Sequence, residues 1–79
     1  MFTNKAADGA NNICGMNVAL LRKKAGISQR QLADALQLAR LDVDKNAIQR
    51  IEAGKRFVTD IELTYLAKVL HVSIAALTE

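Results

Sequence analysis

The sequence predicts an all-α fold, a compact bundle of five short helices, and three observations support this. Hydrophobic residues make up 51% of the chain, but only Phe2, Phe57 and Tyr65 are aromatic. The core must therefore consist of Leu, Ile, Val and Ala, a composition that favours helices over strands. Apolar residues recur at helical spacing, and no proline interrupts them. A chain of 79 residues holds one domain with one small core.

The first stretch of the chain, residues 1–13, is polar, contains Gly and Asn, and has no apolar period. It is typical of a flexible N-terminal tail, which leaves residues 14–79 as the folded domain. The first helix is expected from about Met16 to Ala25. Gly26 follows directly, and glycine often takes the left-handed conformation that ends a helix.

Capping residues predict where the second and third helices begin. Ser28 followed by Gln31 fits a capping box, in which each side chain bonds the backbone N–H of the other residue. Asp44 is a good N-cap and Gly54 a good residue to follow a helix end, so the third helix is expected at about 44–53.

Two further helices complete the predicted bundle. Thr59 and Glu62 form a second capping box in front of the fourth helix. Ser73 can cap a last short turn over Ile74–Leu77.

The third helix carries two contrasting faces. On a helical projection, Ile48 and Ile51 lie on one side. The opposite side carries Lys45, Asn46, Gln49 and Arg50. Arg and Lys can donate to guanine, and Asn and Gln can pair with adenine. A solvated face would more often carry Glu–Lys pairs. The chemistry alone leaves base recognition and a plain solvated surface both open.

Charge and composition narrow the function further. Residues 22–56 carry nine basic side chains against four acidic ones, a net charge of +5, as a polyanion-binding face needs. One His, the single Cys14, no Gly-rich phosphate loop and no metal-ligand spacing argue against an enzyme, a cofactor, a metal or a small-molecule ligand. Cys14 is expected to be a small buried hydrophobic residue more often than a reactive thiol.

The sequence contains no long apolar run and no signal peptide. We therefore expect a cytoplasmic protein with no membrane partner.

Four segments in this order resemble the Cro/CI-type helix-turn-helix repressors, the XRE family: LRKKAGISQ at 21–29, QLA at 31–33, IQRIEAGKR at 48–56 and LAKVLHVS at 66–73. The resemblance covers about 14–77. It implies a lambda-repressor-like DNA-binding domain and a transcriptional regulator, expected to be a repressor. The third helix would enter the major groove of double-stranded DNA, and a homodimer would bind a pseudo-palindromic operator.

The resemblance also implies roles for individual residues. Those expected to contact bases are Lys45, Asn46, Gln49 and Arg50. Those expected at phosphates are Gln29, Lys55 and Arg56, and Gln29 would also brace the third helix. An ion pair between Arg22 and Glu52 would tie the first helix to the third.

One departure from the family concerns the segment between the second and third helices. The second-helix Leu-Ala motif and Glu52 lie roughly five residues farther apart than in most members. The extra residues, around 37–41, are expected to lengthen the second helix or the turn, with Leu38 and Leu41 as anchors. They provide extra core, or else they change the docking angle or add a phosphate contact through Arg40.

A second departure is at His71, where the family commonly has Gly. His71 is expected at the end of the fourth helix, in a left-handed conformation, and not as a metal ligand.

Two questions stay open from the sequence. A small helical domain can also be a protein-interaction module or an antitoxin-like partner protein. Within the DNA-binding interpretation, the sequence predicts neither the operator nor whether the protein represses or activates. The dimer surface is equally open, because Val72, Ile74 and Leu77 either contact a second copy or cover the core of their own domain.

Overall fold

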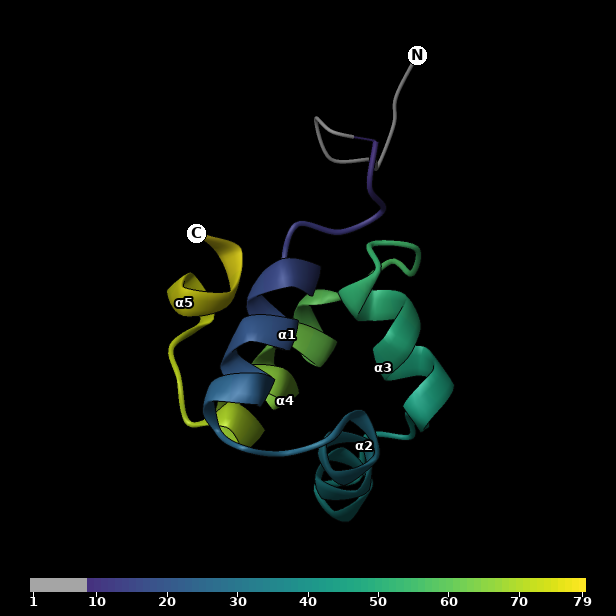
Figure 1. Ribbon diagram of the computed structural model, residues 1–79, viewed down its shortest axis with the longest axis vertical. Coiled ribbons are helices and arrows are strands. Elements are labelled where there is room, and N and C mark those ends of the chain that lie inside the picture. Colours follow the sequence, from purple (N-terminus) through teal and green to yellow (C-terminus); the bar gives the residue numbers. More distant parts are fainter. Residues whose placement is uncertain (1–8) are drawn as a thin grey trace.

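The computed structural model describes residues 9–79, and within them the chain is all-helical (Figure 1). The helices are α1 (Gly15–Lys24), α2 (Gln29–Leu38), α3 (Lys45–Glu52), α4 (Asp60–Leu70) and α5 (Ile74–Thr78). The prediction of a five-helix bundle is confirmed. No helix in this part of the chain has the length and apolar character needed to cross a bilayer.

Side-chain caps begin the helices where the sequence predicts them. The Ser28 hydroxyl accepts from the N–H of Gln31 at 3.0 Å, and the Gln31 amide oxygen accepts from the N–H of Ser28 at 2.8 Å. Thr59 and Glu62 form the same box ahead of α4. Asp44 Oδ1 accepts from the N–H of Ala47 at 2.8 Å and caps α3. These hydrogen bonds confirm both capping boxes and the Asp44 cap. Each cap satisfies backbone N–H groups that the first turn of its helix leaves free.

Left-handed residues end the helices. Gly54 has φ +75° directly after α3, where the N–H of Lys55 donates to the carbonyl of Arg50 at 2.9 Å in a Schellman motif. His71 has φ +58° at the end of α4, as predicted from its position. A left-handed conformation without glycine is uncommon, and histidine is among the residues that tolerate it best.

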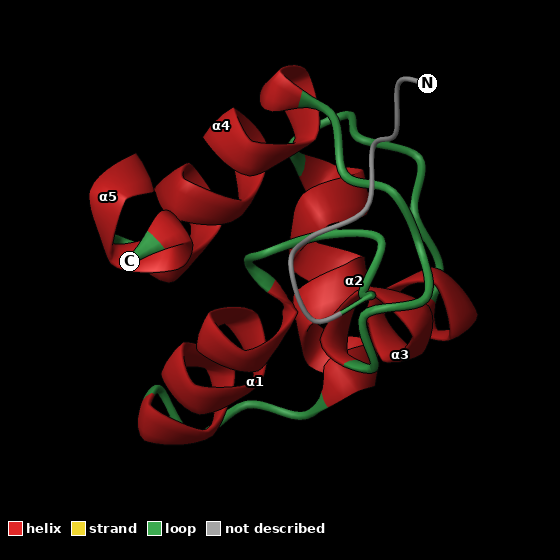
Figure 2. Cartoon of the chain, turned by 90° about the horizontal axis from the view of Figure 1, so that it is seen from above, coloured by secondary structure: helices red, strands yellow, loops and turns green. Residues whose placement is uncertain are grey.

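The helices enclose one apolar core. α3 packs against α1 and α2, and α4 and α5 close the opposite side, with α5 and α3 on either side of α1 (Figures 1 and 2). Leu32, Leu36, Ile48, Leu66 and Leu77 are almost completely buried. Because Leu77 is 0% exposed, this residue covers the core of its own domain and offers nothing to a second copy.

Val72 is partly buried and packs against the same core. Ile74 is different, because 45% of its surface remains exposed on α5. Of the three apolar residues considered for a dimer surface, Ile74 alone therefore keeps a substantial exposed area.

Of the extra residues around 37–41, the first two end α2 at Leu38 and the others lie in the turn that follows. Arg40 takes φ +73°, and the N–H of Leu41 donates to the carbonyl of Leu36 at 2.9 Å. Leu41 packs against the core, as predicted, but Leu38 is 87% exposed, so the predicted anchor at Leu38 is wrong. The left-handed turn at Arg40 brings Leu41 back to the core in the apolar position that a Schellman motif provides.

The predicted tail, residues 1–13, extends too far. Residues 1–8 lie outside the described residues, but Asn11 and Asn12 are hydrogen bonded to the chain at the end of α3. Carbonyl groups near a helix C-terminus lack intrahelical partners, and the two Asn side chains supply donors to this region. The prediction of a flexible tail is therefore wrong for Asn11 and Asn12.

Candidate nucleic-acid interface

The outer face of α3, defined as Lys45, Asn46, Gln49 and Arg50, is exposed, as the helical projection predicts. Ile48 is 0% and Ile51 2% exposed on the other side, where they hold the helix to the core. Within residues 9–79, none of the four outer side chains forms a hydrogen bond or ion pair with another side chain or with the backbone. The outer face thus presents two cations and two amides with free hydrogen-bonding groups.

The charge around this face suits a negatively charged partner. The first turn of α3 carries no acidic side chain, and Arg50 lies in its last turn. The exposed carboxylate of Asp44 caps the helix and keeps its negative charge at the start of α3. A polyanion approaching the outer face therefore meets two cations and two amides, with this one carboxylate beside them.

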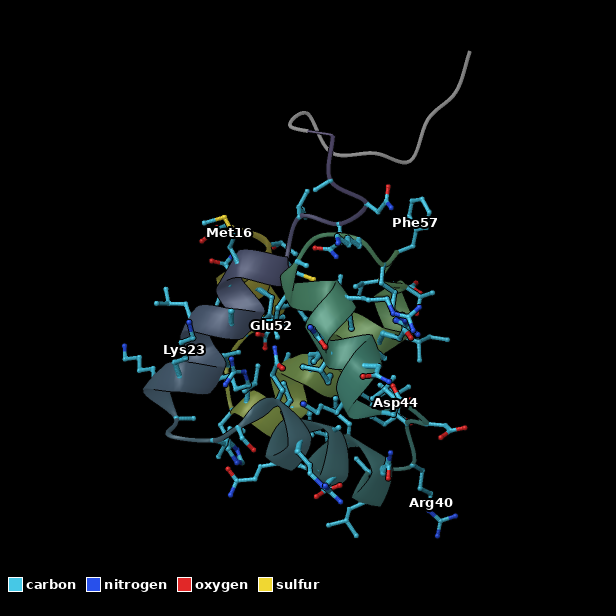
Figure 3. The ribbon with its side chains drawn as sticks, turned by 45° about the vertical axis from the view of Figure 1, so that its right-hand side comes forward. Met16, Lys23, Arg40, Asp44, Glu52 and Phe57 are labelled. Carbon is cyan, nitrogen blue, oxygen red and sulfur yellow. The ribbon has the colours of Figure 1, made fainter. Side chains whose placement is uncertain are left out.

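Glu52 lies at the inner end of α3 and holds three segments together. Its carboxylate accepts from Arg22 Nε at 2.7 Å and from Arg22 Nη2 at 3.0 Å. Arg22 Nη1 also donates to the carbonyl of Ile27 at 2.9 Å, in the turn between α1 and α2. The two side chains are only 10% and 8% exposed, and Figure 3 shows Glu52 between α1 and α3. The ion pair implied by the family resemblance is thus present and nearly buried.

The environment of Glu52 favours its charged form. Burial by itself raises the pKa of the carboxyl, but hydrogen bonds from Arg22 and Gln29, with the Arg22 charge, outweigh burial. The pKa of Glu52 is therefore lower than its usual value, and that of Arg22 is raised by the same hydrogen bond. At neutral pH the pair is fully ionised.

Gln29 joins this pair from the first residue of α2. Its Nε2 donates to Glu52 Oε1 at 3.0 Å, so Gln29 braces α3 through Glu52. The side chain is half-buried, because part of it faces the ion pair. Its expected contact with a DNA phosphate stays a prediction.

Lys55 and Arg56 follow α3, and they differ in how free they are. Lys55 is exposed and its ammonium has no partner within residues 9–79. Arg56 is half-buried, and its Nη2 lies 2.9 Å from Glu62 Oε2. Burial raises the pKa of Glu62, but the bonds from Arg56 and Thr59 outweigh burial and lower it overall. Of the two predicted phosphate ligands, Lys55 is therefore the more available.

Arg40 lies beside the start of α3, in the lengthened turn. It is exposed, and Figure 3 shows it projecting from the edge of the molecule that also carries Asp44. The turn itself is held by Gln37, whose Nε2 donates to the carbonyl of Val43 at 2.8 Å. The turn therefore presents Arg40 to solvent from an anchored backbone.

Three residues near α3 had no role in the sequence-based site: Asn11, Asn12 and Gly15. Both Asn side chains donate to carbonyls at the end of α3 or in the loop after it. A Cβ at Gly15 would overlap the carbonyl oxygen of Ile51, so glycine allows α1 to begin against α3. An Asn pair just before a helix is a local signal for capping, but nothing in it indicates a partner some forty residues away.

Metal-ligating and thiol groups were the other candidates for a site. Residues 9–79 contain no group of three or more His, Cys, Asp or Glu side chains placed to hold a metal ion. Cys14 is 1% exposed, and burial raises the pKa of its thiol. It is thus a buried apolar residue, as predicted.

Comparisons with known proteins agree with this geometry. A family model described as helix-turn-helix matches residues 18–77. The crystal structure of the restriction-modification controller protein C.AhdI from Aeromonas hydrophila is similar, with a TM-score of 0.70 and 27% sequence identity. The match covers 80% of this chain and 84% of that one. No curated protein matched in sequence. The chain belongs to the helix-turn-helix family of Cro/CI (XRE) type, and it is a DNA-binding transcriptional regulator.

Proposed function

We propose that this regulator is a repressor that binds a pseudo-palindromic operator as a homodimer, with α3 of each copy in the major groove. The observation that carries the proposal is the outer face of α3, where four exposed side chains have no partner in the described part of the chain. Hydrogen-bonding groups left free on a folded surface are the ones that can pair with base edges.

The dimensions of α3 suit this role. Its eight residues give a helix about 12 Å long, and the major groove is about 12 Å wide, so one groove can take the whole helix. Arg50 and Lys45 can donate to guanine O6 and N7, and Gln49 and Asn46 can pair with adenine N6 and N7. The outer face therefore supplies sequence recognition.

Residues around α3 would set its position on the duplex. Lys55 follows the helix, Arg40 precedes it, and Gln29 lies at the start of α2. Contacts to phosphates fix register and orientation but carry no sequence information. Arg56 would contribute less, since leaving Glu62 would cost it an existing ion pair.

A dimer follows from the small size of the contact surface. One eight-residue helix reaches few base pairs, so one copy alone would discriminate weakly among sequences. Two copies related by a two-fold axis would place their α3 helices about 34 Å apart, in successive major grooves. Bound across a promoter, such a dimer would exclude RNA polymerase.

Selection of bound sequences from a random DNA pool tests this function. We expect an enriched motif with two inverted half-sites one helical turn apart, and lower expression of a reporter whose promoter overlaps it. Failure to enrich any sequence would contradict base recognition. An enriched single half-site would contradict the dimer, and a rise in reporter expression would contradict repression.

A further inference from the structure

The segment before α1 is bonded to the chain that follows α3. Asn12 Nδ2 donates to the carbonyls of Arg56 at 2.7 Å and Ile51 at 3.1 Å. Asn11 donates through its backbone N–H to Gly54 at 2.7 Å and through Nδ2 to Lys55 at 2.9 Å. We call Asn11 and Asn12 the N-terminal clasp, because they bind four carbonyl groups within six residues of chain.

The clasp acts on groups that α3 does not satisfy by itself. The Schellman motif uses the N–H groups of Gly54 and Lys55, which donate back into the helix. The carbonyls of Gly54, Lys55 and Arg56 instead accept from the clasp. The backbone of this loop is therefore held from two sides. The loop N–H groups donate to α3, and the loop carbonyls accept from the clasp.

Two glycines allow the clasp to lie this close. A Cβ at Gly15 would overlap the carbonyl oxygen of Ile51, which also accepts from Asn12. A Cβ at Gly54 would lie 3.1 Å from the Cβ of Ala10. The segment before α1 and the chain after α3 thus pack with no room for a larger residue at Gly15 and with a tight contact at Gly54, which also has φ +75°.

The loop that the clasp holds carries Lys55, whose side chain is exposed and unpaired within residues 9–79. A lysine on a loosely held loop loses backbone freedom when it binds a phosphate, and this loss weakens binding. A loop whose three carbonyls are already bonded to the clasp has lost that freedom on folding. The Lys55 ammonium is then presented at a defined distance from the outer face of α3.

We propose that Asn11 and Asn12 are positioning residues for DNA binding, and that they act by holding the loop that presents Lys55 to a phosphate. This inference rests on the proposed phosphate contact of Lys55. It adds that the segment before α1, outside the matched helix-turn-helix region of residues 18–77, takes part in DNA affinity.

The test compares Asn12→Ala with Asn17→Ala as a matched control. Asn17 Nδ2 donates to the carbonyl of Leu77 at 2.8 Å and joins α1 to α5, on the side of α1 away from α3 (Figure 1). Asn17→Ala removes one bond from a part-buried Asn to a distant backbone carbonyl. Asn12→Ala removes two such bonds, and also the bond that Asn12 Oδ1 accepts from the N–H of Gly15 at 2.8 Å at the start of α1. Only Asn12 is bonded to the loop that carries Lys55.

The measurement is the affinity for a duplex carrying the selected sequence, by fluorescence anisotropy, over a series of salt concentrations. The slope of log K against log salt is negative, and losing one phosphate contact reduces its steepness by about 0.9. We expect this decrease for Lys55→Ala and a large part of it for Asn12→Ala. Asn17→Ala should keep the slope of the unaltered protein. Relative preference among single-base variants of the duplex should not change, because phosphate contacts carry no sequence information.

A double-mutant cycle shows whether the clasp acts through Lys55. If it does, Asn12→Ala causes little further loss of affinity once Lys55 is already Ala. Additive losses, or an unchanged salt slope in Asn12→Ala, would overturn the inference while leaving the phosphate contact of Lys55 intact. An unchanged slope in Lys55→Ala would overturn the phosphate contact itself, and the inference with it.

Thermal unfolding of each variant shows that it is folded at the assay temperature. If Asn12→Ala is unfolded there, Asn11→Ala replaces it, because this change removes a single side-chain bond to Lys55 and keeps the backbone bond to Gly54. The expected result is then a smaller decrease in salt slope than for Lys55→Ala. A slope equal to that of Asn17→Ala would overturn the inference.

Discussion

The two sides of α3 contrast in how their polar groups are satisfied. On the inner side, Glu52 is nearly buried, with every oxygen of its carboxylate bonded to Arg22 or Gln29. On the outer side, Gln49 and Arg50 are exposed and unpaired within residues 9–79. One short helix can thus stabilise the fold with its inner side and leave its outer side for recognition. Groups satisfied by the fold stabilise it, and groups left free are available to a partner.

The largest expected effect comes from breaking the inner ion pair. Glu52→Ala leaves Arg22 buried without its partner, and removing one member of a buried pair costs about 3–5 kcal/mol of unfolding free energy. Chemical denaturation followed by circular dichroism measures this loss. Glu52→Gln is the matched control, since an amide oxygen can still accept from Gln29 or Arg22, and it should cost less. A loss below about 1 kcal/mol for Glu52→Ala, typical of surface pairs, would contradict the role assigned to the pair.

A change on the outer side should weaken DNA binding and leave the stability of the fold nearly unchanged. Gln49→Ala is expected to weaken binding to the selected duplex by about 1–3 kcal/mol, because a bidentate contact to a base is lost. Its unfolding free energy should stay within about 0.5 kcal/mol of the unaltered protein, since the side chain is exposed. Anisotropy and denaturation on the same sample check both. A large loss of stability with unchanged binding would reverse the assignment of the two sides.

The pH dependence of stability sharpens the same contrast. The pKa of Glu52 is lower in the folded protein than its ordinary value, so the unfolded chain binds more protons. The contribution of Glu52 is therefore complete above the ordinary glutamate pKa of about 4.3, and it is lost as the pH falls through the lower folded pKa. Denaturation from pH 7 to pH 3 should show stability falling on acidification, and Glu52→Gln should flatten the curve. An equally steep curve in Glu52→Gln would assign the acid sensitivity to Glu62, whose pKa is also lowered.

The smallest expected effect lies in the turn before α3. A non-glycine residue in the left-handed region costs about 1–2 kcal/mol, and glycine loses about 0.5–1 kcal/mol more backbone entropy on folding. Arg40→Gly, at φ +73°, should therefore stabilise the fold slightly, by less than about 1.5 kcal/mol. If Arg40 contacts a phosphate, the same change should weaken DNA binding and lower its salt slope. A stabilised variant with unchanged binding would remove Arg40 from the phosphate contacts.

Much of the fold could be predicted because its signals are local. The caps at Ser28, Asp44 and Thr59 bond groups three residues away, so the pattern and the bond lie within one turn. The opposite placement of Ile48 and Gln49 follows from helical geometry alone. Local signals therefore predicted where helices begin and which side of α3 stays exposed.

What was missed depends on contacts between distant parts of the chain. The partners of Asn12 are Ile51 and Arg56, 39 and 44 residues away, and no local pattern indicates them. Leu38 lies in α2 two residues after the buried Leu36, on the opposite side of the helix, so its exposure follows from helical geometry. The turn after it was not foreseen, because Arg40 takes a left-handed conformation that arginine rarely adopts. The pairing of Arg56 with Glu62 reduces the availability of a cation that the family resemblance alone presents as free.

The most direct test of the central claim is a comparison of base preference between the unaltered protein and Arg50→Ala. Affinities are measured for the selected duplex and for every single-base variant of one half-site. If the outer face of α3 contacts bases, Arg50→Ala should lose discrimination at one position, by about 1–3 kcal/mol, and keep it at the others. An equal loss of affinity for every sequence would show that Arg50 contributes charge alone, and would contradict base recognition by this residue.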